Sequence, residues 1–129
     1  MKKFIAWIII IALLITLVVL IVQRVNDNRE PTSEEAFAQC LDESGTTFYG
    51  AYWCPRCATQ KAMFGRAKKA LPYVVCSTPN RELTSVCADA GIESYPTWEG
   101  PDGTRITGER TFEELSELSG CPLPNDLEA

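Results

Sequence analysis

Cys54 and Cys57 stand three positions apart in the segment Trp53-Cys54-Pro55-Arg56-Cys57. An apolar run precedes this segment and a stretch of good helix formers follows it, which predicts the passage from a strand into a helix. At a helix start, unpaired backbone N–H groups and the positive end of the helix dipole stabilise a thiolate. Pro55 suits the first helical position, and Cys57 lies near enough to close a disulfide. The spacing therefore predicts a redox-active cysteine pair.

The sequence contains no histidine. This excludes histidine as a general base, Ser-His and Cys-His nucleophile pairs, and His-ligated metals. Covalent haem attachment is also excluded, because Ala58 and not a histidine follows Cys57. The chemistry is therefore assigned to the cysteines, with no cofactor and no metal. Six cysteines indicate disulfides in an oxidising compartment, whereas in the cytosol they would indicate metal binding or transient redox chemistry.

Residues 4–22 form an uncharged run without glycine or proline. As a helix the run would be about 28 Å long, close to the thickness of the hydrocarbon core of a bilayer, about 30 Å. The alternative is a cleaved signal peptide, whose apolar region is shorter and ends in small residues. This run ends in Val-Gln-Arg-Val-Asn, so we expect an uncleaved transmembrane signal-anchor over residues 1–22. Residues 23–33 are predicted to be a polar linker, and residues 34–129 a folded domain.

The orientation of the predicted anchor follows from its flanking charges. Lys2, Lys3 and the free amino terminus precede the apolar run, and Arg24 and Arg29 follow it. The positive-inside rule then favours a cytoplasmic N-terminus, with the domain in the periplasm, the cell exterior or an organelle lumen. From residue 25 onward there are 9 basic and 17 acidic residues, which argues against nucleic-acid binding.

The remaining chain alternates between helix and strand patterns. Ser33 is predicted to cap the first helix of the domain, and Thr111 the last. Pro101-Asp102-Gly103 indicates a hairpin turn. In chain order the elements are a helix over residues 34–43, a strand over 46–53, a helix over 55–71, a strand over 73–76, a helix over 81–90, an extended segment over 92–98, a strand over 105–107 and a helix over 112–119. This order predicts an α/β fold with a mixed sheet and helices on both faces.

At this point the chain resembles the thioredoxin superfamily, whose redox motif matches residues 53–57 and whose cis-proline matches Pro96. The segments Tyr49–Cys57, Pro72–Ser77, Cys87 and Gly91–Trp98 together resemble, more narrowly, the thioredoxin-like domain associated with bacterial vitamin K epoxide reductase homologues. The resemblance covers residues 36–123 and implies a trimmed fold of about four strands, because residues 23–33 do not read as the family's first strand.

The resemblance implies a role for each residue of the motif. Cys54 would be the attacking, more exposed thiol and Cys57 the resolving one. The backbone of Tyr95, next to Pro96, would pair with an extended substrate segment, and Tyr52 and Trp53 would border that groove. Pro55 and Arg56 would modulate the site. The Arg56 cation favours the Cys54 thiolate, so we predict a disulfide more oxidising than that of a cytosolic thioredoxin.

Two positions depart from cytosolic thioredoxins. Phe48 aligns with their buried acid, and Ala58 with the lysine that follows their second cysteine. The usual proton relay for the buried thiol is therefore missing, which weakens an interpretation as a general reductase.

The other four cysteines have several open interpretations. The resemblance implies a disulfide between Cys76 and Cys87; the alternatives are two free thiols or a second redox pair. Cys40 and Cys121 have no match in the family, and a disulfide between them would tie the two ends of the domain together. A zinc site from Cys54, Cys57, Cys76 and Cys87 is the remaining alternative, although a second closely spaced pair is lacking.

Together these features predict a membrane-anchored thiol-disulfide oxidoreductase that acts on secreted or envelope protein thiols. The resemblance implies reoxidation by a quinone-linked, vitamin K epoxide reductase-like membrane partner. One alternative is an envelope disulfide reductase of the cytochrome-maturation type. Another is a non-catalytic binding module that keeps the fold and holds a partner at Tyr95.

Overall fold

The structure is a computed structural model that describes residues 1–27 and 29–128. Asn28, within the predicted linker, and Ala129, at the end of the predicted domain, lie outside the described residues. The chain divides into two compact units, Met1–Glu30 and Pro31–Ala129, which are described separately.

The first unit is one helix, α1 (Lys2–Asp27). Residues 3–26 are long and apolar enough to cross a membrane, and an 18-residue stretch within them has a mean hydropathy of 3.4. The hydroxyl of Thr16 donates to the carbonyl of Ala12 at 2.8 Å, so this polar group is satisfied inside the helix. The helix runs past Val22, so residues 23–27 of the predicted linker are helical here.

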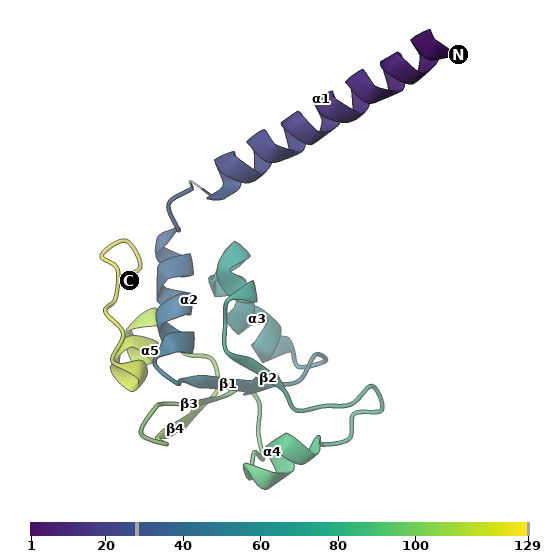
Figure 1. Cartoon of the computed structure of the whole chain (residues 1–129). Helices are drawn as coiled ribbons and strands as arrows, with labels where there is room; N and C mark the ends of the chain where they lie inside the picture. The colour runs from purple at the N-terminus through teal and green to yellow at the C-terminus, as the bar shows by residue number, and fades with distance from the viewer. Residues whose placement is uncertain (28, 129) are drawn as a thin grey trace. The chain divides into compact units, whose positions relative to one another are not determined.

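A four-stranded mixed sheet forms the centre of the second unit (Figure 1). Its strands are β1 (Thr47–Gly50), β2 (Tyr73–Val75), β3 (Thr97–Glu99) and β4 (Arg105–Thr107). Their order is β2-β1-β3-β4; β1 pairs in parallel with β2 and antiparallel with β3, and β3 pairs antiparallel with β4. The predicted α/β class, with about four strands in a mixed sheet, is confirmed.

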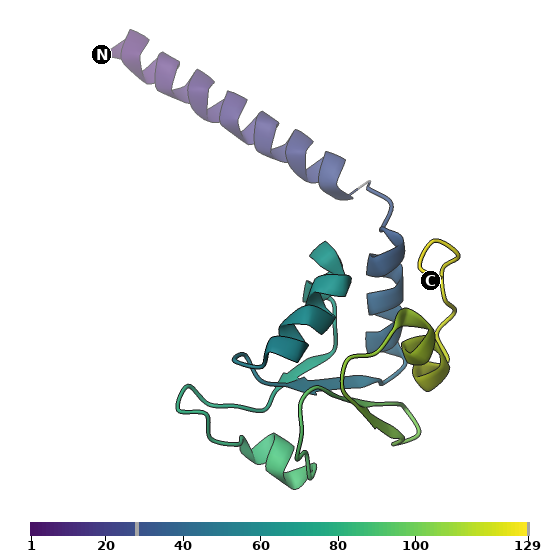
Figure 2. The same ribbon diagram turned by 180° about the vertical axis from the view of Figure 1, so that it is seen from behind.

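Helices cover both faces of this sheet (Figures 1 and 2). One face carries α2 (Ser33–Glu43), α3 (Pro55–Met63) and α5 (Phe112–Ser119), while α4 (Ser85–Asp89) lies on the other. The side chains of neighbouring residues in β1 point to opposite faces of the sheet, because side chains alternate along a strand. Phe48 stacks on Trp98 with ring centroids 4.3 Å apart in the larger core, and Tyr49 packs in a smaller cluster with Cys87 of α4.

Several predicted boundaries are wrong for identifiable reasons. Thr32 and not Ser33 caps α2, in a capping box with Glu35 whose side chain and backbone N–H bond reciprocally with Thr32. The predicted helix over residues 55–71 ends at Met63, and a 3₁₀ helix, η1 (Gly65–Lys69), begins at Gly65, whose φ is +53°. The predicted strand over residues 46–53 pairs only over Thr47–Gly50, because each partner strand has only three residues.

The segment before α4 differs most from its prediction. The sequence predicts a helix over residues 81–90, yet α4 begins only at Ser85. Arg81 has a φ of +65°, which a helix does not allow. Its N–H bonds to the carbonyl of Thr78, and that of Thr84 bonds to the carbonyl of Cys76, so these residues close a loop instead.

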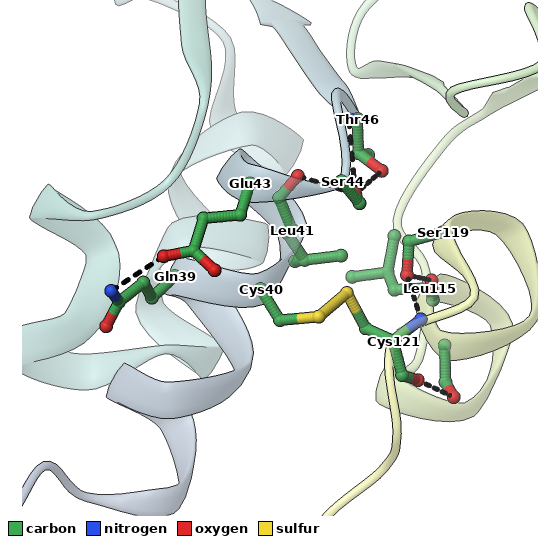
Figure 3. Close-up of a disulfide and its surroundings, with 10 residues drawn as sticks. Gln39, Cys40, Leu41, Glu43, Ser44, Thr46, Leu115, Ser119 and Cys121 are labelled. Carbon is green, nitrogen blue, oxygen red and sulfur yellow. Dashed lines mark hydrogen bonds between the residues drawn. A yellow bond between two sulfur atoms is a disulfide. The ribbon is translucent and has the colours of Figure 1, made fainter.

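A disulfide joins the two ends of the second unit (Figure 3). Cys40, on α2, bonds to Cys121, which follows α5, across a sequence separation of 81 residues. Ser119 holds the second end in place, because its hydroxyl accepts the N–H of Cys121 and donates to the carbonyl of Leu115.

Candidate redox site

The cysteine motif lies where β1 passes into α3. Cys54 is the N-cap of α3, and its Sγ accepts the backbone N–H of Cys57 at 3.2 Å. Pro55 occupies the start of the helix, where its missing N–H leaves no hydrogen bond unmade. The first thiol therefore takes the place of a capping oxygen, at the end of the helix that favours negative charge.

The two thiols differ in their surroundings. Both are free; Cys54 is 6% exposed, whereas Cys57 is 0% exposed. Burial, helped by the hydrogen bond with Cys54, raises the pKa of the Cys57 thiol from 9.0 to about 12. Cys57 therefore keeps its proton at neutral pH, and Cys54 is the sulfur that an external group can reach more easily. Arg56 is exposed on the first turn of α3.

Two aromatic side chains, Trp53 of the motif and Tyr52 just before it, form hydrogen bonds to the loop before α4. The indole N–H of Trp53 donates to the hydroxyl of Ser77 at 2.7 Å, and the guanidinium of Arg81 lies 5.6 Å from its ring centroid. The hydroxyl of Tyr52 donates to the carbonyl of Pro79 at 2.8 Å. Both rings remain partly exposed, so a rim of aromatic surface borders the cysteines.

The segment with Tyr95 and Pro96 meets this rim from β3. The Tyr95–Pro96 peptide bond is cis. The ring of Tyr95 meets that of Trp53 edge to face, with centroids 6.0 Å apart. Pro96 is buried, and its carbonyl accepts the N–H of Gly108 at 2.8 Å. The structure thus brings Tyr95 against the motif, and burial together with the nearby Cys57 raises the pKa of its hydroxyl.

Sequence reasoning missed the groups behind Cys57. A Cβ built on Gly50 would meet both the Sγ of Cys57 and the hydroxyl of Tyr73, so glycine allows these groups to approach. The ammonium of Lys61 lies 3.8 Å from the centroid of the Tyr73 ring. The sequence held one usable signal, because Lys61 follows Cys57 by four residues and so shares its face of a helix.

A buried amide fixes α3 from the other side. Gln60 is fully buried; its side chain donates to the carbonyl of Arg110 at 3.0 Å and accepts the N–H of Arg110 at 2.6 Å. These two bonds satisfy both ends of the amide and tie α3 to the segment that precedes α5. Nothing in the sequence pattern indicated this contact across 50 positions.

The structure pairs the remaining cysteines as two disulfides. Cys76 and Cys87 are joined with a Cα–Cα distance of 5.4 Å, and Cys40 and Cys121 with one of 5.9 Å. The first of these closes the loop that carries Ser77 and Arg81, so it lies beside the redox site. Within residues 1–27 and 29–128, no group of three or more His, Cys, Asp or Glu side chains is placed to hold a metal ion.

Comparison with models of known protein families gives no match. Among curated proteins, the chain is similar to the thiol-disulfide oxidoreductase LTO1 of Arabidopsis thaliana, with 42% identity over 93 residues. The match covers 68% of this chain but only 24% of that relative. The chain therefore resembles one part of a much longer thiol-disulfide oxidoreductase.

Proposed function

We propose that this chain is a thiol-disulfide oxidoreductase with a thioredoxin-like domain, in which Cys54 exchanges disulfides with substrates and Cys57 resolves them. One observation carries the proposal: the free Cys54 thiol caps α3 and accepts the N–H of Cys57, whose own thiol lies buried one turn behind it. The similarity to a protein named for this activity supports the same assignment.

The chemistry follows from the two environments. Cys54 lies at the N-terminus of α3, where backbone N–H groups favour negative charge, so it suits the sulfur that attacks a substrate and later leaves it. The buried Cys57 is sheltered from outside disulfides, so it reacts within the motif. A substrate joined to Cys54 in a mixed disulfide can then leave in two ways. Attack by the substrate's own second thiol releases the substrate as a disulfide, whereas attack by Cys57 releases it as a thiol.

We assign substrate binding to the aromatic rim and to the Tyr95–Pro96 segment. Tyr95 lies just before β3 begins at Thr97, and its ring packs on Trp53. An extended substrate segment would pair with the backbone of Tyr95 and bring its cysteine over Cys54, while Tyr52 and Trp53 border it.

We further propose that α1 anchors the domain to a membrane with the N-terminus in the cytoplasm. Lys3 at the helix start supports this orientation, and two disulfides support an oxidising compartment for the domain. Secreted or envelope protein thiols would be the substrates. The electrons would then pass to a quinone-linked, vitamin K epoxide reductase-like membrane protein.

A trapping experiment tests the exchange activity. The full chain with Cys57→Ala, produced in cells so that it inserts into a membrane, should accumulate mixed disulfides through Cys54 that disappear on reduction. The matched control carries Cys54→Ala in addition and should trap nothing. Absence of adducts in the single variant would reject the activity and favour a binding module without catalysis.

A second measurement tests the direction of electron flow. Acid quenching followed by thiol alkylation reports the state of the Cys54 and Cys57 pair in growing cells. We expect a mostly oxidised pair that becomes reduced when the quinone-linked partner is removed. A pair that is mostly reduced with the partner present would instead indicate an envelope reductase.

A further inference from the structure

The hydroxyl of Tyr73 is a buried polar group with no hydrogen-bond partner among the described residues. Tyr73 begins β2, and its ring packs on Phe48 with centroids 5.0 Å apart. A buried hydroxyl without a partner lowers stability, so native structures rarely keep one without a reason.

The position of this hydroxyl relative to Cys57 supplies such a reason. A Cβ on Gly50 would lie 2.9 Å from the Sγ of Cys57 and 3.1 Å from the Oη of Tyr73. The sulfur and the hydroxyl oxygen are therefore at most about 6 Å apart, a separation that a small side-chain shift or one water closes. Gly50 is the residue that leaves the space between them open.

The charges around Tyr73 identify it as a donor and not as a base. Burial, with the nearby Cys57 and Cys54, raises the pKa of the Tyr73 hydroxyl to about 12, so it keeps its proton at neutral pH. The Lys61 ammonium lies over its ring and favours negative charge nearby, including a thiolate on Cys57. Tyr95 is a second tyrosine near Cys57, because burial and this thiol together raise the pKa of its hydroxyl.

We propose that the Tyr73 hydroxyl donates a hydrogen bond to the Cys57 thiolate that forms when the Cys54–Cys57 disulfide opens, and that Lys61 supports this charge. The inference rests on the proposed exchange activity. It assigns to Tyr73 and Lys61 a task at the buried thiol that neither Phe48 nor Ala58 can perform.

The step balances as follows. A substrate thiolate forms a bond to Cys54 Sγ, the bond between Cys54 and Cys57 breaks, and its electron pair stays on Cys57 Sγ. Tyr73 stabilises the Cys57 thiolate until this thiolate takes the proton of the substrate's second thiol. The new substrate thiolate then forms the substrate disulfide and releases Cys54, which takes a proton from solvent. The substrate dithiol is oxidised, and the protein disulfide is reduced to two thiols.

Exchange kinetics with Tyr73→Phe test the proposal, because this variant loses only the hydroxyl. The oxidised full chain in detergent micelles is mixed with excess glutathione, and opening of the disulfide is followed by quenching and thiol alkylation. We expect opening to be roughly three- to ten-fold slower, because the leaving thiolate has lost a hydrogen bond. Lys61→Met, which keeps a long unbranched side chain and removes the charge, should also slow this step. Tyr49→Phe, on the opposite face of the sheet, is the matched control and should react at the rate of the parent.

The equilibrium constant with glutathione separates this role from a structural one. At neutral pH the reduced protein holds Cys57 as a thiol, so Tyr73→Phe should change the equilibrium by less than about two-fold while both exchange directions slow equally. Tyr73→Phe at the parent rate overturns the inference, as does an equilibrium shift as large as the rate change. If the parent itself fails to exchange with glutathione, the proposed function fails first.

Discussion

The two disulfides are expected to stabilise the domain unequally, and in an order that their loop lengths predict. Cys40–Cys121 closes a separation of 81 residues, and Cys76–Cys87 one of 11. A cross-link stabilises by restricting the unfolded chain, and the effect grows with the logarithm of the loop length. The long loop gives about 4.5 kcal/mol and the short loop about 2.8 kcal/mol on this basis.

The perturbation is to replace each pair by alanine in the full chain, as Cys40→Ala with Cys121→Ala and as Cys76→Ala with Cys87→Ala. Urea unfolding in detergent micelles, followed by tryptophan fluorescence, gives the free energy of unfolding of each variant. The free energy of unfolding of each variant is then compared with that of the parent under reducing conditions, where no cross-link exists. Subtracting this second difference removes the cost of the lost sulfur atoms and the contribution of Cys54 and Cys57.

After this correction, loss of the long-loop cross-link should cost about 2 kcal/mol more than loss of the short-loop one. Loss of side-chain packing alone would make removal of Cys76 and Cys87 the more costly change, because both are fully buried whereas Cys40 is half-buried. Equal corrected costs, or a larger cost for the short loop, would refute the entropic reasoning.

The effect on exchange chemistry should follow the opposite order. Cys76–Cys87 closes the loop in which Ser77 accepts the indole N–H of Trp53, so its removal should slow exchange at the motif. Cys40–Cys121 ties α2 to the end of the chain (Figure 3), and its removal should leave the exchange rate near that of the parent at temperatures where the variant is folded.

Three further outcomes follow from the interior of the domain. The reduced protein should lose stability relative to the oxidised protein as pH rises from 9 toward 12, because the unfolded Cys57 thiol ionises before the buried one; paired urea titrations measure this loss, at most about 1.4 kcal/mol per pH unit. Gly50→Ala should destabilise the domain by about 1–3 kcal/mol in urea, because its Cβ would lie 2.8 Å from Tyr73 and 2.9 Å from the Cys57 sulfur. Gln60→Leu should cost about 2 kcal/mol or more, because both backbone groups of Arg110 lose their partner.

Each of these outcomes has a contrary result. Parallel pH profiles for the oxidised and reduced proteins would contradict the burial of the Cys57 thiol. A neutral Gly50→Ala would show that the interior adjusts without cost. For Gln60, the exposed Gln39 on α2 is the control, since Gln39→Leu should change stability by less than about 0.5 kcal/mol; equal effects at the two positions would contradict the anchoring role.

Local signals in the sequence predicted the elements that are bounded locally. The last helix, α5, begins after its cap, Thr111, and ends at Ser119, before Gly120 with its φ of +75°, which matches the predicted helix over residues 112–119. The hairpin turn at Asp102 and Gly103 was likewise predicted. These boundaries depend on capping and turn residues within a few positions, so no distant part of the chain has to be known.

Other boundaries depend on contacts that the sequence does not reveal. The predicted helix over residues 81–90 begins late because Arg81 adopts a left-handed conformation, in which its N–H donates to the carbonyl of Thr78. The amide of Glu82 also bonds to the hydroxyl of Thr78, so helix propensity gives way to a closed loop. The redox pair itself was predicted from spacing, but the roles inferred for Tyr73 and Lys61 required the sheet and α3 to be placed together.

The packing of Phe48 explains why a hydrogen-bond donor, and not a base, would serve the buried thiol. Phe48 stacks on Trp98 and contacts Tyr73, so the place that an acid would need is filled by aromatic core. A donor that stabilises the Cys57 thiolate only while it exists lowers the barrier equally for the opening and closing of the disulfide. It therefore sets the speed of exchange and leaves its direction unchanged. We expect the direction to be set by the relative stability of the protein and substrate disulfides and by the proposed electron acceptor. Deleting the proposed acceptor should consequently invert the redox state of the Cys54 and Cys57 pair in cells, whereas Tyr73→Phe should only delay the approach of the pair to its final state.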